Sequence, residues 1–192
     1  MGRIDRATGK RSGGIVGLTS QQSGYVANMR AELADPTAMA NYFTRERRDR
    51  RFDGLVRKAI ADGKPVTKAD IDRIAARYAD RLLKLRGDTI ARTESITAYR
   101  AGQHEAFTQM VDSGKVRAEQ VIRKWSSAHD SRTRRDHLAM DGTVLRGLDA
   151  PFIAPDRSLL RFPGDTSLGA SARETIQCRC SAVYSVDRRK VT

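Results

Sequence analysis

The spacing of apolar residues in the first half of the chain predicts amphipathic helices. Tyr25, Val26, Met29 and Leu33 recur at helical spacing, which places them on one helical face. Thr19 precedes this stretch and Gln22 follows three residues later, an order typical of a capping box at the start of a helix. We therefore expect a first helix that begins directly after Thr19.

Further helices are expected up to the middle of the chain. A second helical tract is predicted over residues 36–62, with Gly63 as its C-terminal stop. A third helix is predicted over residues 67–85. Residues 90–111 are expected to form a fourth helix or to continue the third. Both remain open because Gly87 weakens a helix but does not always end it.

The pattern changes after Lys115, where short runs rich in β-branched and aromatic residues alternate with Gly, Pro, Asp and Ser. The predicted strands lie within residues 116–125, 143–145, 159–162 and 178–186. The chain is therefore expected to have an α+β fold, with a helical N-terminal half and a small antiparallel-sheet domain packed on a long helix. The expected organisation is a flexible basic arm (1–14), a helical N-terminal region (15–86) and a sheet domain (87–192).

The charge of the chain adds a second constraint. Its 192 residues contain 36 Lys and Arg against 23 Asp and Glu, a net charge of +13, and 28 of the 36 basic residues are Arg. Such an excess attracts polyanions at long range. No apolar stretch approaches the ~20 residues that span a membrane, so no membrane partner is expected. The two cysteines are too few for a disulfide scaffold.

The strongest local basic excess lies at Arg45–Arg51, where five Arg and two acidic residues give a charge of +3. The pattern shows no core-facing residue in this run. One interpretation is a solvated helix face; the other is a surface that contacts nucleic-acid phosphates or an acidic protein. The candidate binding residues are Arg45, Arg47, Arg48, Arg50, Arg51, Arg57 and Lys58.

Complete catalytic signatures are missing from the sequence. His104-Glu105 begins a zinc-protease motif, but Thr108 stands where the second His is required. No phosphate-binding glycine loop and no nucleophile elbow occur. We therefore expect no enzymatic activity and no small-molecule substrate.

A cluster of potential metal ligands is nevertheless present. His137 could meet Cys178 and Cys180, since residues i and i+2 of a strand face the same side, and Asp130 could supply a fourth ligand. Two other interpretations remain: buried cysteines packed beside a hydrogen-bonded histidine, which the short Cys-x-Cys spacing favours, or a redox pair. The expectation is therefore no cofactor, with structural zinc as the alternative.

A second polar group interrupts the predicted helix over residues 90–111. Arg92, Thr93, Glu94 and Arg100 could mark a site, or they could satisfy polar groups inside the second half of the chain. Charged residues inside a domain persist when they are paired, and this favours the second interpretation.

Taken together, residues from about 85 to 186 resemble the phage Mu F-like minor head protein family, also called the phage head morphogenesis domain. The resemblance rests on the order and spacing of short elements. These are Ile90–Glu94 with Arg92 and Glu94, then Trp125, Asp130, Arg134, His137, Asp141-Gly142, Phe152, Pro163-Gly164-Asp165 and Cys178-Arg179-Cys180.

The resemblance implies a structural and assembly protein of the head of a tailed phage or prophage. Such a protein would act at the portal vertex, with the portal protein, other head proteins and non-specifically bound double-stranded DNA as partners. It would be located in the virion head after assembly in the bacterial cytoplasm. The motif residues Arg92, Glu94, Trp125, Asp130, Arg134, Asp141 and Gly142 would then be structural.

Two alternatives from other functional classes remain open. A metal-dependent nuclease or hydrolase would use Glu94, Asp130 and His137, and would bring them together at an open cleft. A non-specific nucleic-acid-binding module would need only the basic surface.

Overall fold

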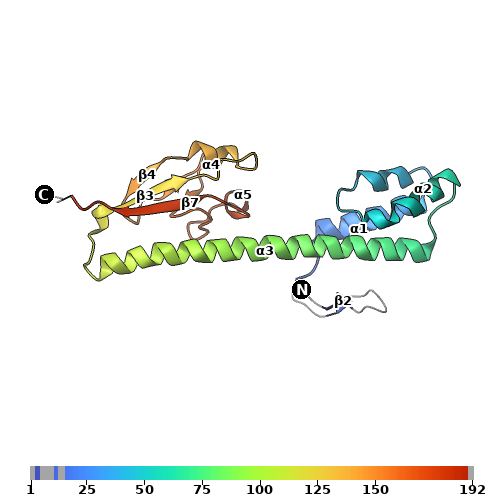
Figure 1. Ribbon diagram of the computed structural model, residues 1–192, viewed down its shortest axis with the longest axis horizontal. Coiled ribbons are helices and arrows are strands. Elements are labelled where there is room, and N and C mark those ends of the chain that lie inside the picture. The colour runs from blue at the N-terminus through green and yellow to red at the C-terminus, as the bar shows by residue number, and fades with distance from the viewer. Residues whose placement is uncertain (1–2, 5–10, 13–15, 190–192) are drawn as a thin grey trace. The chain divides into compact units, whose positions relative to one another are not determined.

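The computed structural model of the chain describes residues 3–4, 11–12 and 16–189 (Figure 1). The chain forms two compact units, Met1–Asp88 and Thr89–Thr192, and each contains a hydrophobic core. Two short strands near the N-terminus, β1 (Arg3–Ile4) and β2 (Arg11–Ser12), pair antiparallel. Most of the arm expected at 1–14, and with it the prediction that the arm is flexible, lies outside the described residues.

The first helix of the first unit, α1 (Ser20–Ala34), starts as the sequence predicts. Thr19 Oγ1 accepts a hydrogen bond from the Gln22 backbone, and the Gln22 side chain accepts one from Thr19 N, so the capping box is confirmed. Met29 and Leu33 are fully buried. The amphipathic pattern therefore identified the face of this helix that packs into the core, but its inclusion of Tyr25 is wrong, because that side chain is exposed.

The prediction of one helical tract over 36–62 is wrong. The structure contains η1 (Met39–Thr44), η2 (Arg50–Phe52) and α2 (Asp53–Ala61), and the chain leaves the helical conformation between η1 and η2. Arg48 Nη1 donates a hydrogen bond to the carbonyl oxygen of Phe43. Phe43 lies near the end of η1, where backbone carbonyl groups are left without helical partners. Asp49 then caps η2 by accepting from the Arg51 backbone. Local side-chain bonds thus replace helical backbone bonds here.

Buried apolar side chains from these helices form the core of the first unit. They are Met29, Leu33, Met39, Tyr42, Val56, Val66, Ile71, Ile74, Tyr78 and Leu82. The last four come from α3 (Lys68–Asp112), which continues through Gly87 without a break. One glycine costs a helix only about 1 kcal/mol, which the surrounding helix-forming residues offset. The helix ends before Gly114, whose φ of +71° is suited to glycine.

The second unit contains the expected antiparallel sheet, in the order β4-β3-β7. The central strand β3 (Val121–Ser126) pairs with β4 (Val144–Arg146) and with β7 (Ser181–Val186). A separate pair, β5 (Phe152–Ile153) with β6 (Leu159–Leu160), and the short helices η3 (Ala118–Gln120), α4 (Arg135–Ala139) and α5 (Ala172–Thr175) complete the unit.

Contacts with α3 confirm that the sheet packs on a long helix. Phe107 stacks on Tyr184 of β7 with ring centroids 4.7 Å apart, and His104 Nδ1 lies 2.9 Å from the Tyr184 hydroxyl. The α+β fold class is therefore confirmed. None of the helices in the described part of the chain combines the length and apolar content that crossing a membrane requires.

Several strand boundaries differ from the prediction: β4 is shifted by one residue, β6 ends at Leu160, and β5 was not predicted. Two further differences are larger. Residues 116–120 are not in the strand, because Ala118–Gln120 forms a 3-10 turn before β3 begins. Cys178 and Cys180 precede β7 instead of belonging to it. The reason is the register: Ser126, the last residue of β3, pairs with Ser181, so no ladder partner remains for the cysteines.

The inner face of β3 carries the largest side chain of the chain. Trp125 has no exposed surface, and its ring meets Phe152 edge-on at 5.2 Å between centroids. Arg123 lies two residues earlier on the same face and is also fully buried. Its guanidinium donates to three backbone carbonyls, those of Gly147, Ala150 and Arg161. One strand thus supplies both the apolar centre of the unit and a polar link to its loops.

Because Trp125 is fully buried, Trp125→Ala is expected to destabilise the second unit by about 3–5 kcal/mol, the usual range for a large core aromatic. Chemical unfolding followed by far-UV circular dichroism measures the loss. Val183→Ala, on the exposed face of β7, is the matched control and should cost far less. Trp125 is the only tryptophan, so wild-type fluorescence should resist acrylamide quenching. Free quencher access would contradict the burial.

The buried carboxylate of Asp49 predicts a pH-dependent contribution to stability. The hydrogen bonds from Arg51 and the charge of Arg81 hold the pKa of Asp49 at about 2. A lowered pKa stabilises the fold above the unfolded value of about 3.9, and this stabilisation is lost as the pH falls through 2. Asp49→Asn should therefore cost about 2 kcal/mol at pH 6 and much less near pH 2. Unfolding curves at both pH values measure the difference.

Glu46→Gln is the control for this prediction, because Glu46 is exposed in the same segment and has no ion pair among the described residues. It should change stability by less than about 0.5 kcal/mol at either pH. An equal loss in the two variants would refute the proposed role of Asp49.

Candidate functional site

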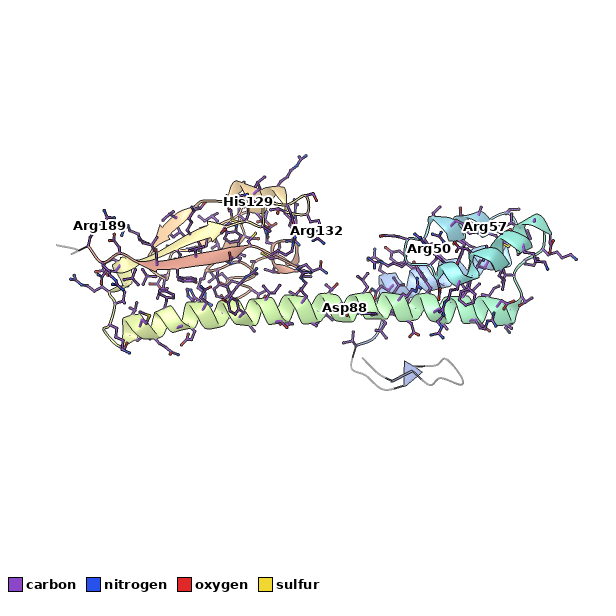
Figure 2. All side chains as sticks on the ribbon, viewed as in Figure 1. Arg50, Arg57, Asp88, His129, Arg132 and Arg189 are labelled. Atoms are coloured by element: carbon purple, nitrogen blue, oxygen red, sulfur yellow. The ribbon has the colours of Figure 1, made fainter. Side chains whose placement is uncertain are left out.

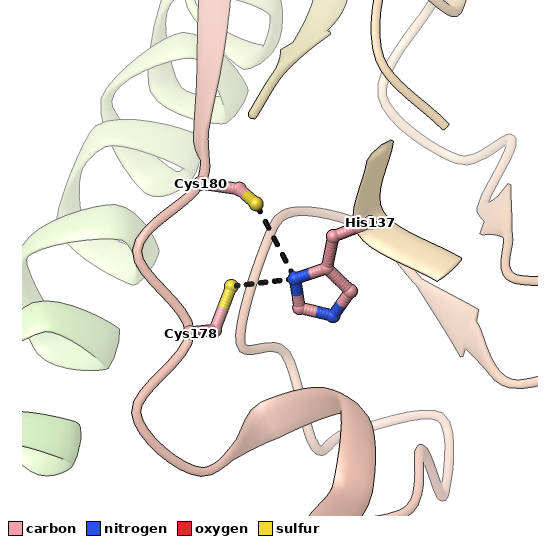
Figure 3. Close-up of side chains that lie close together, drawn as sticks. All are labelled: His137, Cys178 and Cys180. Atoms are coloured by element: carbon pink, nitrogen blue, oxygen red, sulfur yellow. Dashed lines mark hydrogen bonds between the residues drawn. The ribbon is translucent and has the colours of Figure 1, made fainter. Parts of the chain in front are cut away.

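Three potential metal ligands meet inside the second unit. His137 lies on α4, whereas Cys178 and Cys180 lie on the segment between α5 and β7. Both sulfur atoms face the same imidazole nitrogen (Figure 3). His137 Nδ1 is 3.6 Å from Cys178 Sγ and 3.3 Å from Cys180 Sγ, and the three atoms lie within 4.8 Å of one another. The structure thus assembles the cluster that the sequence suggested, although no strand positions the cysteines.

Backbone contacts hold the cysteine segment in place. Arg100 of α3 is buried and donates to the carbonyl oxygens of Pro163 and Cys178, at 3.0 and 3.2 Å. Arg134 donates to the carbonyl of Ile176. Gln177 has a φ of +53°, and its backbone N–H donates to Thr93 Oγ1. The polar groups of α3 therefore position the segment that carries the two thiols.

A carboxylate stands behind the histidine. Glu174 of α5 has no exposed surface, and its Oε2 lies 2.9 Å from His137 Nε2. These two atoms are close enough for an ion pair, but their geometry is not that of a hydrogen bond. Trp125 packs edge-on against the imidazole, with 5.7 Å between ring centroids. The ring is thus held between an apolar wall and a buried acid.

Burial and proximity change the proton affinities of these groups. Burial raises the pKa of the Glu174 carboxyl, while His137 opposes the shift. Burial disfavours the imidazolium, yet Cys178 and Glu174 outweigh it and raise the pKa of His137. The adjacent Cys180 thiol, acting against burial and together with His137, lowers the pKa of Cys178. The cluster thus favours one thiolate beside a charged imidazole.

The cluster borders a cavity of about 130 Å³. Its lining consists of Arg92, Ala128, Arg132, Thr133, Arg134, His137, Gln177, Arg179 and Cys180. Asp130 pairs with Arg179 through both carboxylate oxygens, and this lowers the pKa of Asp130. Four of the nine lining residues are therefore arginines, and only His137 and Cys180 of the cluster reach the cavity.

The carboxylates proposed for a hydrolase do not gather around His137. Glu94 is exposed on α3, and neither Glu94 nor Asp130 lines the cavity. Asp130 is instead engaged by Arg179. The described residues thus offer no convergence of Glu94, Asp130 and His137, and the hydrolase alternative loses its proposed ligand set.

The Asp141-Gly142 pair forms the turn that follows α4. Asp141 Oδ1 accepts from the Ser127 backbone at 2.7 Å, and this hydrogen bond helps to lower the pKa of Asp141. Gly142 adopts a φ of +77°, which favours glycine, and donates its N–H to the Trp125 carbonyl. These contacts give both residues a structural role that fits their place in the sequence pattern.

The basic candidates of the first unit divide into two groups. Three arginines are committed to ion pairs within the unit: Arg45 with Glu32, Arg48 with Asp53 and Arg51 with Asp49. The expectation that residues 45–51 contain no core-facing residue is wrong, because Asp49 is buried and these arginines neutralise acids in and around the core.

The second group remains available to a partner. Arg47, Arg50 and Lys58 are exposed and have no side-chain ion pair among the described residues. Arg57 lies 3.9 Å from Asp53 and keeps most of its side chain exposed. Figure 2 shows Arg50 and Arg57 on the segment that leads from η2 into α2. Within the predicted set, exposed positive charge without a close ion pair thus lies at Arg47, Arg50 and Lys58, with the largely exposed Arg57 beside them.

Sequence reasoning assigned no role to two buried charged residues. The alternation of β3 could have revealed Arg123, since it lies between Val121 and Trp125 on the inner face. Glu174 had no such signal. It lies on a helix of four residues, too short for a periodic pattern.

Comparisons with known proteins identify related sequences. The family model described as "Phage Mu protein F like protein" matches residues 52–183, so the match also includes α2 and the first part of α3. The uncharacterized protein YqbB of Bacillus subtilis (strain 168) is 35% identical over 107 residues, 54% of this chain and 32% of its own length. Minor head protein GP7 of Bacillus phage SPP1 is 30% identical over 97 residues, 50% of this chain and 29% of its own length. The chain thus matches about a third of the length of these relatives. No solved structure matches it significantly.

Proposed function

Because the chain belongs to the phage Mu protein F-like family, we propose that it is a structural and assembly protein of a phage or prophage head. The single observation that carries the proposal is the family match over residues 52–183, and the similarity to a minor head protein of phage SPP1 supports it. In this role the chain acts without enzymatic turnover. It is located in the virion head, after assembly in the bacterial cytoplasm.

The finer part of the proposal concerns partners. The chain acts at the portal vertex, where it contacts the portal protein, other head proteins and packaged double-stranded DNA. The net charge of +13 supports contact with a polyanion, and the exposed side chains of Arg47, Arg50, Arg57 and Lys58 supply a surface for it. Such contact is directed at phosphates and therefore carries no sequence preference.

Co-sedimentation tests the assembly role. The chain, produced with the portal and capsid proteins of its own phage or prophage, should sediment with portal-containing heads and remain in the supernatant with heads that lack portal. Sedimentation with DNA alone, and with no head species, would favour the non-specific nucleic-acid-binding module instead.

DNA binding should be dominated by interactions with phosphates and should weaken steeply with salt. The triple change Arg47→Glu, Arg50→Glu and Lys58→Glu should reduce affinity. It should also lower the magnitude of the log K versus log salt slope, by about 0.9 for each phosphate that the variant no longer neutralises. Fluorescence anisotropy with two unrelated duplexes measures both effects, and the two duplexes should bind alike.

The matched control is Arg135→Glu, Arg157→Glu and Arg188→Glu, three exposed arginines of the second unit without side-chain ion pairs among the described residues. This variant has the same change in net charge and should bind more tightly than the first. Equal losses would show that only net charge matters. The recovered DNA should be intact with Mg²⁺, Mn²⁺ or Zn²⁺ present; cleavage that His137→Ala abolishes would favour the hydrolase alternative.

A further inference from the structure

We propose that the second unit binds one Zn²⁺ ion through Cys178 Sγ, Cys180 Sγ and His137 Nδ1, with a fourth coordination position open to the arginine-lined cavity. The inference goes beyond the head role and does not depend on it. It also selects among the three interpretations that the sequence left open for this cluster.

The first argument is the separation of the ligand atoms. Tetrahedral zinc has Zn–S distances of about 2.3 Å and Zn–N distances of about 2.0–2.1 Å, so bound sulfur and nitrogen lie about 3.5 Å apart. The observed separations are 3.6 Å for Cys178 and 3.3 Å for Cys180. Each sulfur atom thus already lies at about the distance from the imidazole nitrogen that a zinc coordination shell requires.

The second argument is the number of hydrogen-bond donors and acceptors. Both thiols point at the same nitrogen of His137 (Figure 3). Whether it carries a lone pair or a proton, an imidazole nitrogen makes one in-line hydrogen bond. Without a metal ion, only one of the two buried sulfur atoms can therefore bond to that nitrogen, and the other is left with the neighbouring cysteine as its partner. A metal ion uses the lone pair and both sulfur atoms at once.

The third argument is the carboxylate behind the ring. Histidines that bind metals usually have their other ring nitrogen against a carboxylate or carbonyl, which fixes the tautomer and orients the ring. Glu174 takes this position, with its Oε2 2.9 Å from His137 Nε2 and no exposed surface. A buried carboxylate needs a partner. A zinc-bound imidazole, which keeps its proton on Nε2, provides one.

The cavity provides space for a fourth ligand that does not come from the protein. Asp130, the candidate from the sequence, is occupied by Arg179. His137 and Cys180 line the cavity, whose volume of about 130 Å³ can hold water or a small anion beside the proposed ion. Zinc sites with three protein ligands complete their coordination in this way. The ion should therefore be accessible to chelators without prior unfolding.

Metal analysis of the full chain, produced without a polyhistidine tag, tests the proposal. Inductively coupled plasma mass spectrometry should find about one zinc per chain in the wild type. His137→Ala and the double change Cys178→Ser, Cys180→Ser should reduce it to near zero. His129→Ala is the matched control, since His129 is exposed and contacts only Asp141 among the ionisable groups described. It should retain full zinc content.

Cobalt spectroscopy on wild-type protein keeps the test independent of variant folding. After removal of zinc by a chelator, Co²⁺ should produce a thiolate-to-cobalt charge-transfer band and the intense visible bands of a tetrahedral site. Absence of these bands, together with an unchanged melting temperature after chelation, would overturn the proposal in favour of packing. A Cys178–Cys180 disulfide in protein without metal would overturn it in favour of a redox pair.

Glu174→Gln tests the supporting carboxylate. It removes the negative charge and keeps the shape, so zinc affinity should fall by about 10- to 100-fold, the usual cost of losing such a partner. The cobalt spectrum should keep its thiolate band, because both sulfur ligands remain. An unchanged affinity would remove the third argument and count against the site.

Discussion

The second unit depends on one buried guanidinium group. Arg123 has no exposed surface, and it donates to carbonyl oxygens of Gly147, Ala150 and Arg161. Burial disfavours this charge and lowers the pKa of Arg123. The fold tolerates it because carbonyl dipoles from three loop positions replace water. The β4–β5 loop and the segment after β6 are thus held from inside by polar bonds, in addition to apolar packing.

The same device explains the arginine content of the chain. Apolar residues are few, and several arginines connect segments within the units: Arg45 and Arg48 in the first unit, and Arg100, Arg134 and Arg179 in the second. A planar fork with five donors can join segments that a single methyl or hydroxyl group cannot. The basic composition therefore has two separate causes, internal connections and free surface charge. Only the second can serve a polyanionic partner.

The sequence predicted correctly the elements whose apolar or capping residues are regularly spaced. The capping box at Thr19, the amphipathic face of α1, the antiparallel sheet and the α+β class follow from local spacing. The break in the helical conformation at residues 45–49 does not follow from local spacing, because the side chains of Arg48 and Asp49 compete there with helical backbone bonds. The meeting of His137 with both cysteines could be suggested from residue types. The role of Glu174 could not, since only the tertiary structure brings α4 and α5 together.

The close approach of Gly164 to α3 has a consequence for how the chain folds. Gly164 adopts a φ of +86°, and an added Cβ would lie 3.1 Å from Thr97 Oγ1 and 3.2 Å from Arg100 Nη1. Arg100 also binds the carbonyls of Pro163 and Cys178, which are 63 and 78 positions away along the chain. Contacts of such separation must overcome the entropy of closing long loops before they contribute, which slows folding. We therefore expect the docking of the Gly164 loop on α3 to be a late step of folding.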